Sequence, residues 1–182
     1  NSRTANFTIS AKSLSGNDVT LNFTPSGTTY TGSAIEGIVT VTIGEKTLVK
    51  DTDYTVSYNN NVNAGTNTAS VTVTGTGNYT DSKSYNFTIN AKSLADSDVT
   101  VAVAPPSTAY TGSAITGTVT VKFGSSTLAA GTDYTVSYSD NVNVGTVTVT
   151  VKGTKNFTGE KKASFEITKA DQAAPAVTGS YA

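Results

Sequence analysis

The stretch Thr-Asp-Tyr-Thr-Val-Ser-Tyr at residues 52–58 recurs unchanged at residues 132–138. Larger apolar or aromatic side chains alternate with Thr and Ser along it, so Tyr54, Val56 and Tyr58 would share one face of an extended chain. A period of two is typical of a β-strand with one buried and one exposed face. The stretch therefore predicts such a strand in each of two copies, 80 residues apart.

An internal repeat extends outward from this strand in both directions. Residues 11–66 and 91–146 are identical at 34 of 56 ungapped positions. Farther along the chain the offset falls from 80 to 78, because Gly75 corresponds to Gly153. The first copy therefore has two additional residues between Thr66 and Gly75, and a repeat of this length indicates a tandem array.

The additional residues are expected on a hairpin strand or in a bulge of that strand. Side chains of a strand alternate between its faces, so an insertion of two residues preserves which face each one occupies. Val71 and Val73 should then face the core as Val149 and Val151 do.

Further alternating segments in the first copy predict several more strands, separated by turns rich in Asn and Gly. They lie near residues 18–24, 37–43, 71–73 and 85–89, with a short extended piece at Tyr30, a turn at 44–46 and a short strand at Leu48. No helical periodicity is present. About seven short strands per copy favour a β-sandwich, although a barrel fits the same alternation. We therefore expect an all-β chain.

The repeat also predicts the domain organisation. The motif Asn-Phe-Thr-Ile at residues 6–9 recurs at residues 86–89, at the end of the first copy. The two copies are joined without Gly or Pro, so the pair should be semi-rigid and elongated. The expected divisions are an end strand of a preceding repeat at 1–10, one domain at 11–90, a second at 91–168 and a linker to a following unit at 169–182.

Composition excludes many kinds of site. The chain has no Cys or His, so it can form neither disulfides nor Cys- or His-ligated zinc sites, and it has no Ser-His-Asp catalytic set. With 12 basic and 13 acidic residues, it lacks the positive charge that binds nucleic acid or an anionic membrane. No apolar run is long enough to insert into a bilayer. We expect a monomer that is not an enzyme and has no cofactor.

The repeated motifs resemble those of bacterial cell-surface Ig-like tandem repeats. They are Tyr-Thr-Gly-Ser-Ala-Ile at 30–35, Gly-Thr-Asp-Tyr-Thr-Val-Ser-Tyr at 131–138, Asn-Val-Asn-x-Gly-Thr at 61–66, and the later Gly-Asn-Tyr/Phe-Thr and Phe-x-Ile. The resemblance covers about 11–168 and implies two tandem Ig-like β-sandwich domains of about seven strands each. It further implies a secreted or cell-wall-attached bacterial protein, in which these repeats are a structural spacer or stalk whose partners are neighbouring domains. The first copy departs from the pattern at Asp51, where the second copy has Gly131. The conformation of this one turn is therefore not predicted.

Two recurring tyrosines are candidates for a different function. Planar aromatic rings stack on sugars, and Tyr30 and Tyr110 each lie in a Gly-containing segment outside the alternating strands. They are the candidate carbohydrate contacts if the chain is a polysaccharide- or host-surface-binding (adhesin) module. Tyr54 and Tyr58 share the face of Val56, so we expect them in the core with their hydroxyls at its rim.

Other recurring polar residues have structural explanations. Aspartates that precede strands can hold calcium, but they more commonly cap turns, and no calcium-loop motif is present. The Asn-x-Thr sequons match ordinary strand composition, and a Lys–Asn crosslink would need a buried acid that the sequence does not show. No pair of carboxylates suggests glycoside hydrolysis. These residues are Asp18, Asp98, Asp53 and Asp133; Asn6, Asn22, Asn78, Asn86 and Asn156; and Lys12, Lys92, Lys83 and Lys161.

Overall fold

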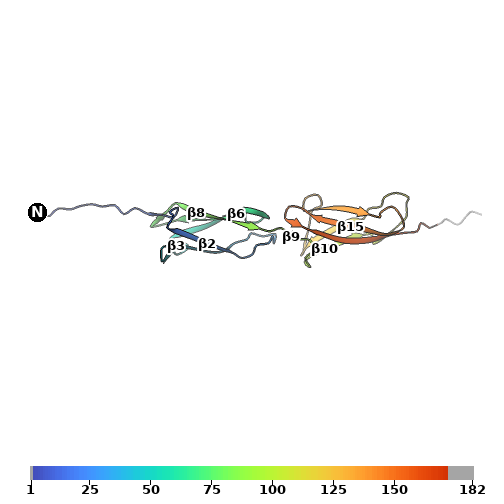
Figure 1. Cartoon of the computed structure of the whole chain (residues 1–182), viewed down its shortest axis with the longest axis horizontal. Helices are drawn as coiled ribbons and strands as arrows, with labels where there is room; N and C mark the ends of the chain where they lie inside the picture. Colours follow the sequence, from blue (N-terminus) through green and yellow to red (C-terminus); the bar gives the residue numbers. More distant parts are fainter. Residues whose placement is uncertain (1, 172–182) are drawn as a thin grey trace, which may run out of the picture. The chain divides into compact units, whose positions relative to one another are not determined.

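The computed structural model describes residues 2–171, and within that range the chain is all-β, as predicted (Figure 1). Seventeen strands and no helix are present there. Accordingly, these residues include no candidate for a membrane-spanning helix. The chain divides at residues 92–93 into two compact units, called unit 1 and unit 2 below, and the short strand formed by these two residues is described with unit 2, with which it pairs. Most of the expected C-terminal linker, residues 172–182, lies outside the described residues.

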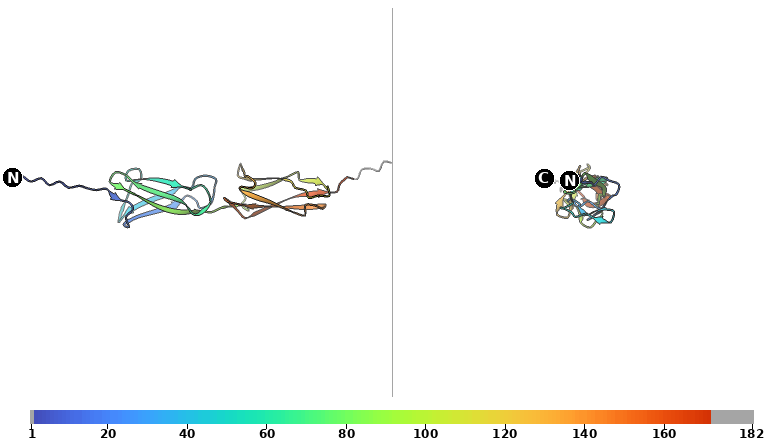
Figure 2. Two further views of the ribbon diagram at one scale, coloured as in Figure 1. Left: turned by 90° about the horizontal axis from the view of Figure 1, so that it is seen from above. Right: turned by 90° about the vertical axis from the view of Figure 1, so that its left-hand side faces the viewer.

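Unit 1 consists of two antiparallel three-stranded sheets and one short parallel pair (Figure 2). The sheets have the orders β2-β3-β4 and β5-β6-β8, and β1 pairs with β7. The strands are β1 (Lys12–Ser13), β2 (Val19–Pro25), β3 (Gly37–Ile43), β4 (Lys46–Thr47), β5 (Tyr54–Asn59), β6 (Gly65–Gly75), β7 (Tyr79–Thr80) and β8 (Ser82–Ile89).

Unit 2 repeats this arrangement with one more strand. Its sheets have the orders β10-β12-β13 and β11-β17-β15-β14, and β9 pairs with β16. The strands are β9 (Lys92–Ser93), β10 (Val99–Ala104), β11 (Ser107–Ala109), β12 (Thr118–Phe123), β13 (Ser126–Thr127), β14 (Tyr134–Ser139), β15 (Gly145–Gly153), β16 (Phe157–Thr158) and β17 (Glu160–Thr168). The added strand β11 runs parallel to β17, whereas its counterpart in unit 1 is a single bridge between Thr29 and Asn90.

The core of each unit lies where the inward faces of its sheets meet. In unit 1, one buried cluster draws on both sheets, and it includes Val41 of β3 and Val73 of β6. Its members are Leu14, Val19, Val41, Leu48, Tyr54 and Val73. In unit 2 the corresponding interior contains Val149 of β15 and Phe165 of β17. Tyrosines apart, no polar or charged side chain of the described residues is buried.

The two-residue insertion lies at a bulge in β6, as predicted. Gly65 pairs with Ile89 and Ala69 with Phe87, so four steps along β6 oppose two along β8. In unit 2 the same pairing advances residue by residue through β15. The side chains of Val71 and Val73 are fully buried, as are Val149 and Val151, so the prediction about their faces is confirmed.

The predicted turn at 44–46 is too long. Gly44 has a φ of 57°, the left-handed conformation that glycine adopts readily, so the chain reverses tightly and β4 already begins at Lys46. As a consequence Leu48 follows this strand instead of lying in it. The turn at Asp51, which the sequence did not predict, has the same conformation as its counterpart in unit 2: φ is 64° at Asp51 and 78° at Gly131. The match is possible because aspartate tolerates a positive φ.

Candidate functional site

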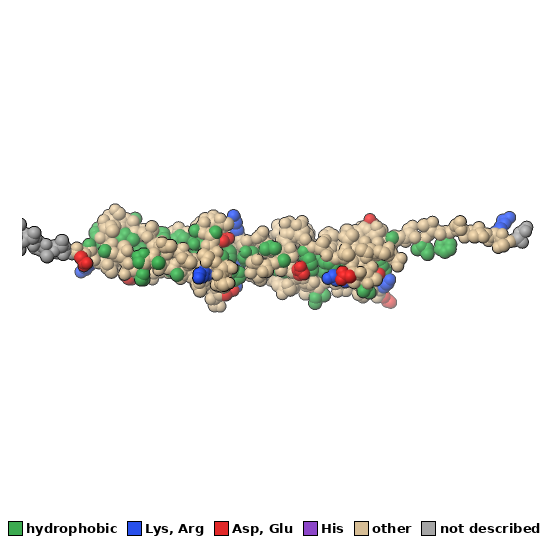
Figure 3. Space-filling model, turned by 180° about the vertical axis from the view of Figure 1, so that it is seen from behind, with side chains coloured by type: hydrophobic (Ala, Val, Ile, Leu, Met, Phe, Trp, Pro, Cys, Tyr) green, Lys and Arg blue, Asp and Glu red, His purple; other side chains and the backbone are tan. Residues whose placement is uncertain are grey.

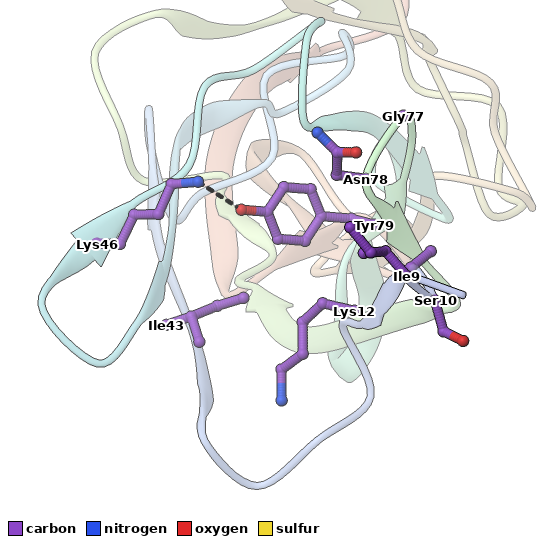
Figure 4. Close-up of a pocket in the computed structure, with 9 residues that line it drawn as sticks. Ile9, Ser10, Lys12, Ile43, Lys46, Gly77, Asn78 and Tyr79 are labelled. Atoms are coloured by element: carbon purple, nitrogen blue, oxygen red, sulfur yellow. Dashed lines mark hydrogen bonds between the residues drawn. The ribbon is translucent and has the colours of Figure 1, made fainter. Parts of the chain in front are cut away.

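A cavity of about 510 Å³ lies at the end of unit 1 where the chain enters it (Figure 4). The entering segment and β1 form one wall, the end of β3 and the start of β4 form another, and the turn into β7 completes it. The parallel pair of β1 with β7 fixes this arrangement, because Lys12 pairs with Tyr79. The lining residues are Ile9, Ser10, Ala11, Lys12, Ile43, Lys46, Gly77, Asn78 and Tyr79.

The most distinctive polar contact of this cavity joins Lys46 to Tyr79. The Lys46 Nζ donates a hydrogen bond of 2.7 Å to the Tyr79 hydroxyl, and this bond is the main cause that raises the pKa of Lys46. The ammonium lies 5.3 Å from the ring centroid. Since it is so much closer to the hydroxyl, it sits at the hydroxyl edge of the ring and leaves the ring faces uncovered by lysine.

The other polar side chains of the cavity differ in their availability. Lys12 forms an ion pair with Asp18, with Nζ 2.6 Å from Oδ2, and its hydrogen bond lowers the pKa of that carboxyl. The Lys46 ammonium forms no ion pair with a described residue. Asn78, the chain neighbour of Tyr79, also lines the cavity (Figure 4). Lys46, Asn78 and Tyr79 are therefore the groups that could meet a ligand.

Unit 2 has an apolar contact at the corresponding place. By the repeat offsets, Phe157 replaces Tyr79, Phe123 replaces Ile43 and Ser126 replaces Lys46. The Phe157 side chain is only 3% exposed, and its ring packs edge-on against Phe123 at a centroid distance of 5.8 Å. The combination of cation and phenol is therefore specific to unit 1.

The two predicted carbohydrate contacts lie in different units. Tyr30 is half-buried and packs against the core cluster that contains Ile35 and Phe87. Tyr110 is more accessible, with 39% of its surface exposed. Neither tyrosine lines the cavity beside Tyr79, and their proposed role in sugar binding stays a prediction.

The other recurring tyrosines are core residues, as predicted. The Tyr58 hydroxyl donates to the Gly37 carbonyl at 3.3 Å, and the Tyr138 hydroxyl donates to the Gly117 carbonyl at 2.8 Å. Tyr54 is buried, and this burial is the main cause that raises the pKa of its phenol. Hydroxyls that bond the main chain of the facing sheet position the two sheets against each other.

The recurring aspartates of the β5 and β14 turns cap those turns, as expected. The Asp53 Oδ2 accepts a hydrogen bond of 2.9 Å from the Val49 N–H, and Asp133 does the same for Ala129. Residues 2–171 contain no cluster of three or more acidic, His or Cys side chains that could hold a metal ion. On the face shown in Figure 3, charged side chains are scattered and form no large patch of one sign.

Two recurring lysines fasten a loop in each unit instead of standing beside a crosslinking partner. The Lys83 Nζ donates to the main-chain carbonyls of Gly16, at 3.0 Å, and Val19, at 2.6 Å. In unit 2, the Lys161 Nζ donates to the carbonyls of Asp96 and Val99. Each ammonium therefore bonds main-chain oxygens across the unit.

Sequence reasoning did not identify the cavity beside Tyr79. Its lining comes from three separated parts of the chain, which only the folded structure brings together. One signal was present, since the substitutions between the copies at Tyr79 and Lys46 remove a hydroxyl and a charge. Comparisons with models of known protein families, with curated proteins and with solved structures find no match to this chain.

Proposed function

We propose that the chain is a tandem pair of Ig-like β-sandwich repeats that bears tension as a spacer in a secreted or wall-attached surface protein. The proposed location and the Ig-like class follow from the sequence resemblance. In this proposal the partners are the neighbouring domains of the same polypeptide, and the chain has no catalytic role.

The observation that carries this proposal is where the chain enters and leaves each unit. In unit 2, the Leu94 N–H donates to the Thr158 carbonyl at 2.9 Å, so the entering chain lies beside the start of β17. The chain leaves this unit at Thr168, the far end of the same strand. In unit 1, Leu14 bonds Thr80 in the same way, immediately before β8.

A force applied to the two ends of unit 2 therefore acts along β17. Antiparallel β17 and β15 are paired continuously from Glu160 to Ile167, and hydrogen bonds between such strands run perpendicular to them. Sliding β17 out would strain these bonds together, whereas peeling it away would break them one after another. This geometry suits a domain that transmits tension.

Recurring polar side chains support the same proposal, because the fold uses them in both units. The Asn61 amide donates to the Ile35 carbonyl at 3.0 Å, and Asn141 donates to Ile115 at the same distance. Together with the tyrosine, aspartate and lysine contacts described above, these bonds account for much of the shared polar sequence. What the two copies have in common thus serves structure.

Pulling unit 2 from two pairs of attachment points tests the proposal. The sequence has no cysteine, so Asn90→Cys with Lys169→Cys defines one pulling direction, and Asn143→Cys with Lys169→Cys defines another. We expect a severalfold higher unfolding force for the first pair, which loads β17 along its length, than for the second, which peels it from the start of β15. Single-molecule force spectroscopy measures both forces on otherwise identical chains.

Equal forces in the two directions would contradict a tension-bearing spacer. Small-angle scattering of the unmodified chain provides a second check, and a compact, near-spherical profile would count against an elongated spacer.

A second candidate is a module that binds a polysaccharide or a host surface, and the exposure of Tyr110 is the observation that favours it. The side chain of Tyr110 is more exposed to solvent than that of Tyr30, which is half-buried. In this alternative, the sugar-binding surface would be formed around Tyr110 in unit 2.

A further inference from the structure

We propose that unit 1 also binds an acidic sugar, such as a uronic-acid residue of a polysaccharide, in the cavity beside Tyr79. This activity goes beyond the proposed spacer function and does not depend on it. Protein sites for small ligands are typically cavities of about 300–1,000 Å³, and the volume of about 510 Å³ found here is within that range.

The Lys46 ammonium is the group that would recognise the carboxylate. Its bond to the Tyr79 hydroxyl uses one of three N–H donors. No carboxylate of the described residues lies within ion-pair distance of it, although the charge of Asp53, whose carboxylate bonds the Val49 N–H, contributes to its raised pKa. The remaining donors can bind a ligand carboxylate, and such charge-assisted hydrogen bonds are stronger than those between neutral groups. The Tyr79 hydroxyl also holds the long lysine side chain in one place before a ligand arrives.

The Tyr79 ring and the Asn78 amide are the groups that would contact the sugar ring and its hydroxyls. The Tyr79 ring is half-buried against the core cluster of unit 1 but also lines the cavity, and the lysine occupies only its hydroxyl edge. The part of the ring that faces the cavity can therefore meet the C–H groups of a pyranose, which the negative face of the π system attracts. The amide of Asn78, which also lines the cavity, offers both a donor and an acceptor for sugar hydroxyls (Figure 4). A cation, an aromatic face and an amide thus meet in one cavity.

Unit 2 shows that the fold does not require these groups. There, Ser126 and Phe157 stand in place of Lys46 and Tyr79, and Phe157 is buried against Phe123. The same strands form in both units, so the cation and the phenolic hydroxyl of unit 1 are additions to the shared structure. Two test substitutions follow from this comparison, Lys46→Ser and Tyr79→Phe. Each one introduces the residue type that unit 2 has at the matching position.

The test is a titration of the full chain with tri-galacturonic acid, followed by NMR amide shifts and by calorimetry. We expect saturable binding with shifts centred on residues 77–79 and on Lys46. The variant Lys46→Ser should bind the sugar roughly tenfold more weakly or worse, because it loses the hydrogen bonds from a charged donor. Tyr79→Phe should weaken binding by a smaller factor, because it frees the ammonium but retains the ring.

Matched controls separate this site from general charge attraction. Lys152→Ser removes the same charge from an exposed position in unit 2 and should leave the affinity unchanged. A neutral xylotriose should bind far more weakly than the acidic trisaccharide. Equal weakening by Lys46→Ser and Lys152→Ser, equal binding of tri-glutamate, or no saturable binding at millimolar sugar would each overturn the proposal. None of these outcomes alters the pulling experiment, so this proposal and the spacer proposal fail separately.

Discussion

Replacing Leu94 with alanine is expected to destabilise unit 2 by about 2–5 kcal/mol, the range for removing a fully buried leucine side chain. Leu94 has no exposed surface, and its N–H is bonded to the Thr158 carbonyl where the chain enters the unit. The substitution keeps the main-chain bond but leaves a cavity in the core. Because a small domain is stable by only about 5–15 kcal/mol, the loss should be large in proportion.

Hydrogen exchange read by mass spectrometry, in peptides assigned to each unit, is the measurement. Leu14→Ala is the matched variant, since Leu14 is equally buried at the equivalent position of unit 1. Each substitution should accelerate exchange throughout its own unit. A change below about 1 kcal/mol in the substituted unit would show that the leucine site is not a packed core.

Gly37→Ala is expected to cost about 1–3 kcal/mol or more in unit 1, because the added methyl group would overlap main-chain atoms. A Cβ at Gly37 would collide with the Thr24 carbonyl oxygen and would lie 2.7 Å from the Cα of Pro25. These atoms belong to the paired strand β2 and cannot rotate away. The Gly37 main chain is also bonded to the Tyr58 hydroxyl, so a shift there would strain both sheets.

Gly117→Ala provides the comparison in unit 2. There the nearest atom to an added Cβ is Cγ1 of Val103, at 2.6 Å, and this is the end of a side chain that can change rotamer. The next atom, the Ala104 carbonyl oxygen, is 3.4 Å away. Chemical denaturation should therefore show a smaller loss for Gly117→Ala than for Gly37→Ala. Equal losses would mean that main-chain contact at β3 is not what requires glycine.

The long strands could be predicted because their side chains alternate over many residues. Tyr54, Val56 and Tyr58 face inward on β5, as their alternation with Thr and Ser predicted. The same kind of alternation predicted the bounds of β2 and β3 to within one or two residues. The pairs β1–β7 and β9–β16 could not be predicted in this way. A strand of two residues has no measurable period, and Lys12 meets Tyr79 only after the intervening chain has folded.

The cavity beside Tyr79 was beyond prediction for a related reason. The sequence shows that Lys46 and Tyr79 differ from their counterparts, but it gives no sign that the two side chains meet. Their hydrogen bond depends on β4 and β7 reaching the same end of the unit. By contrast, the turn-capping role of Asp53 is local, since its partner Val49 is four residues away, and it could be predicted from the sequence.

The bulge in β6 marks a place where the chain can accept foreign sequence. Thr66, Asn67 and Thr68 are exposed, and the two-residue difference between the copies is accommodated there while Val71 and Val73 stay buried. A peptide epitope inserted at this position would project into solvent and could be detected by antibody on intact protein. The repeat thus contains its own labelling site, which lines no part of the cavity beside Tyr79 but lies next to the end of β8, where the chain leaves unit 1.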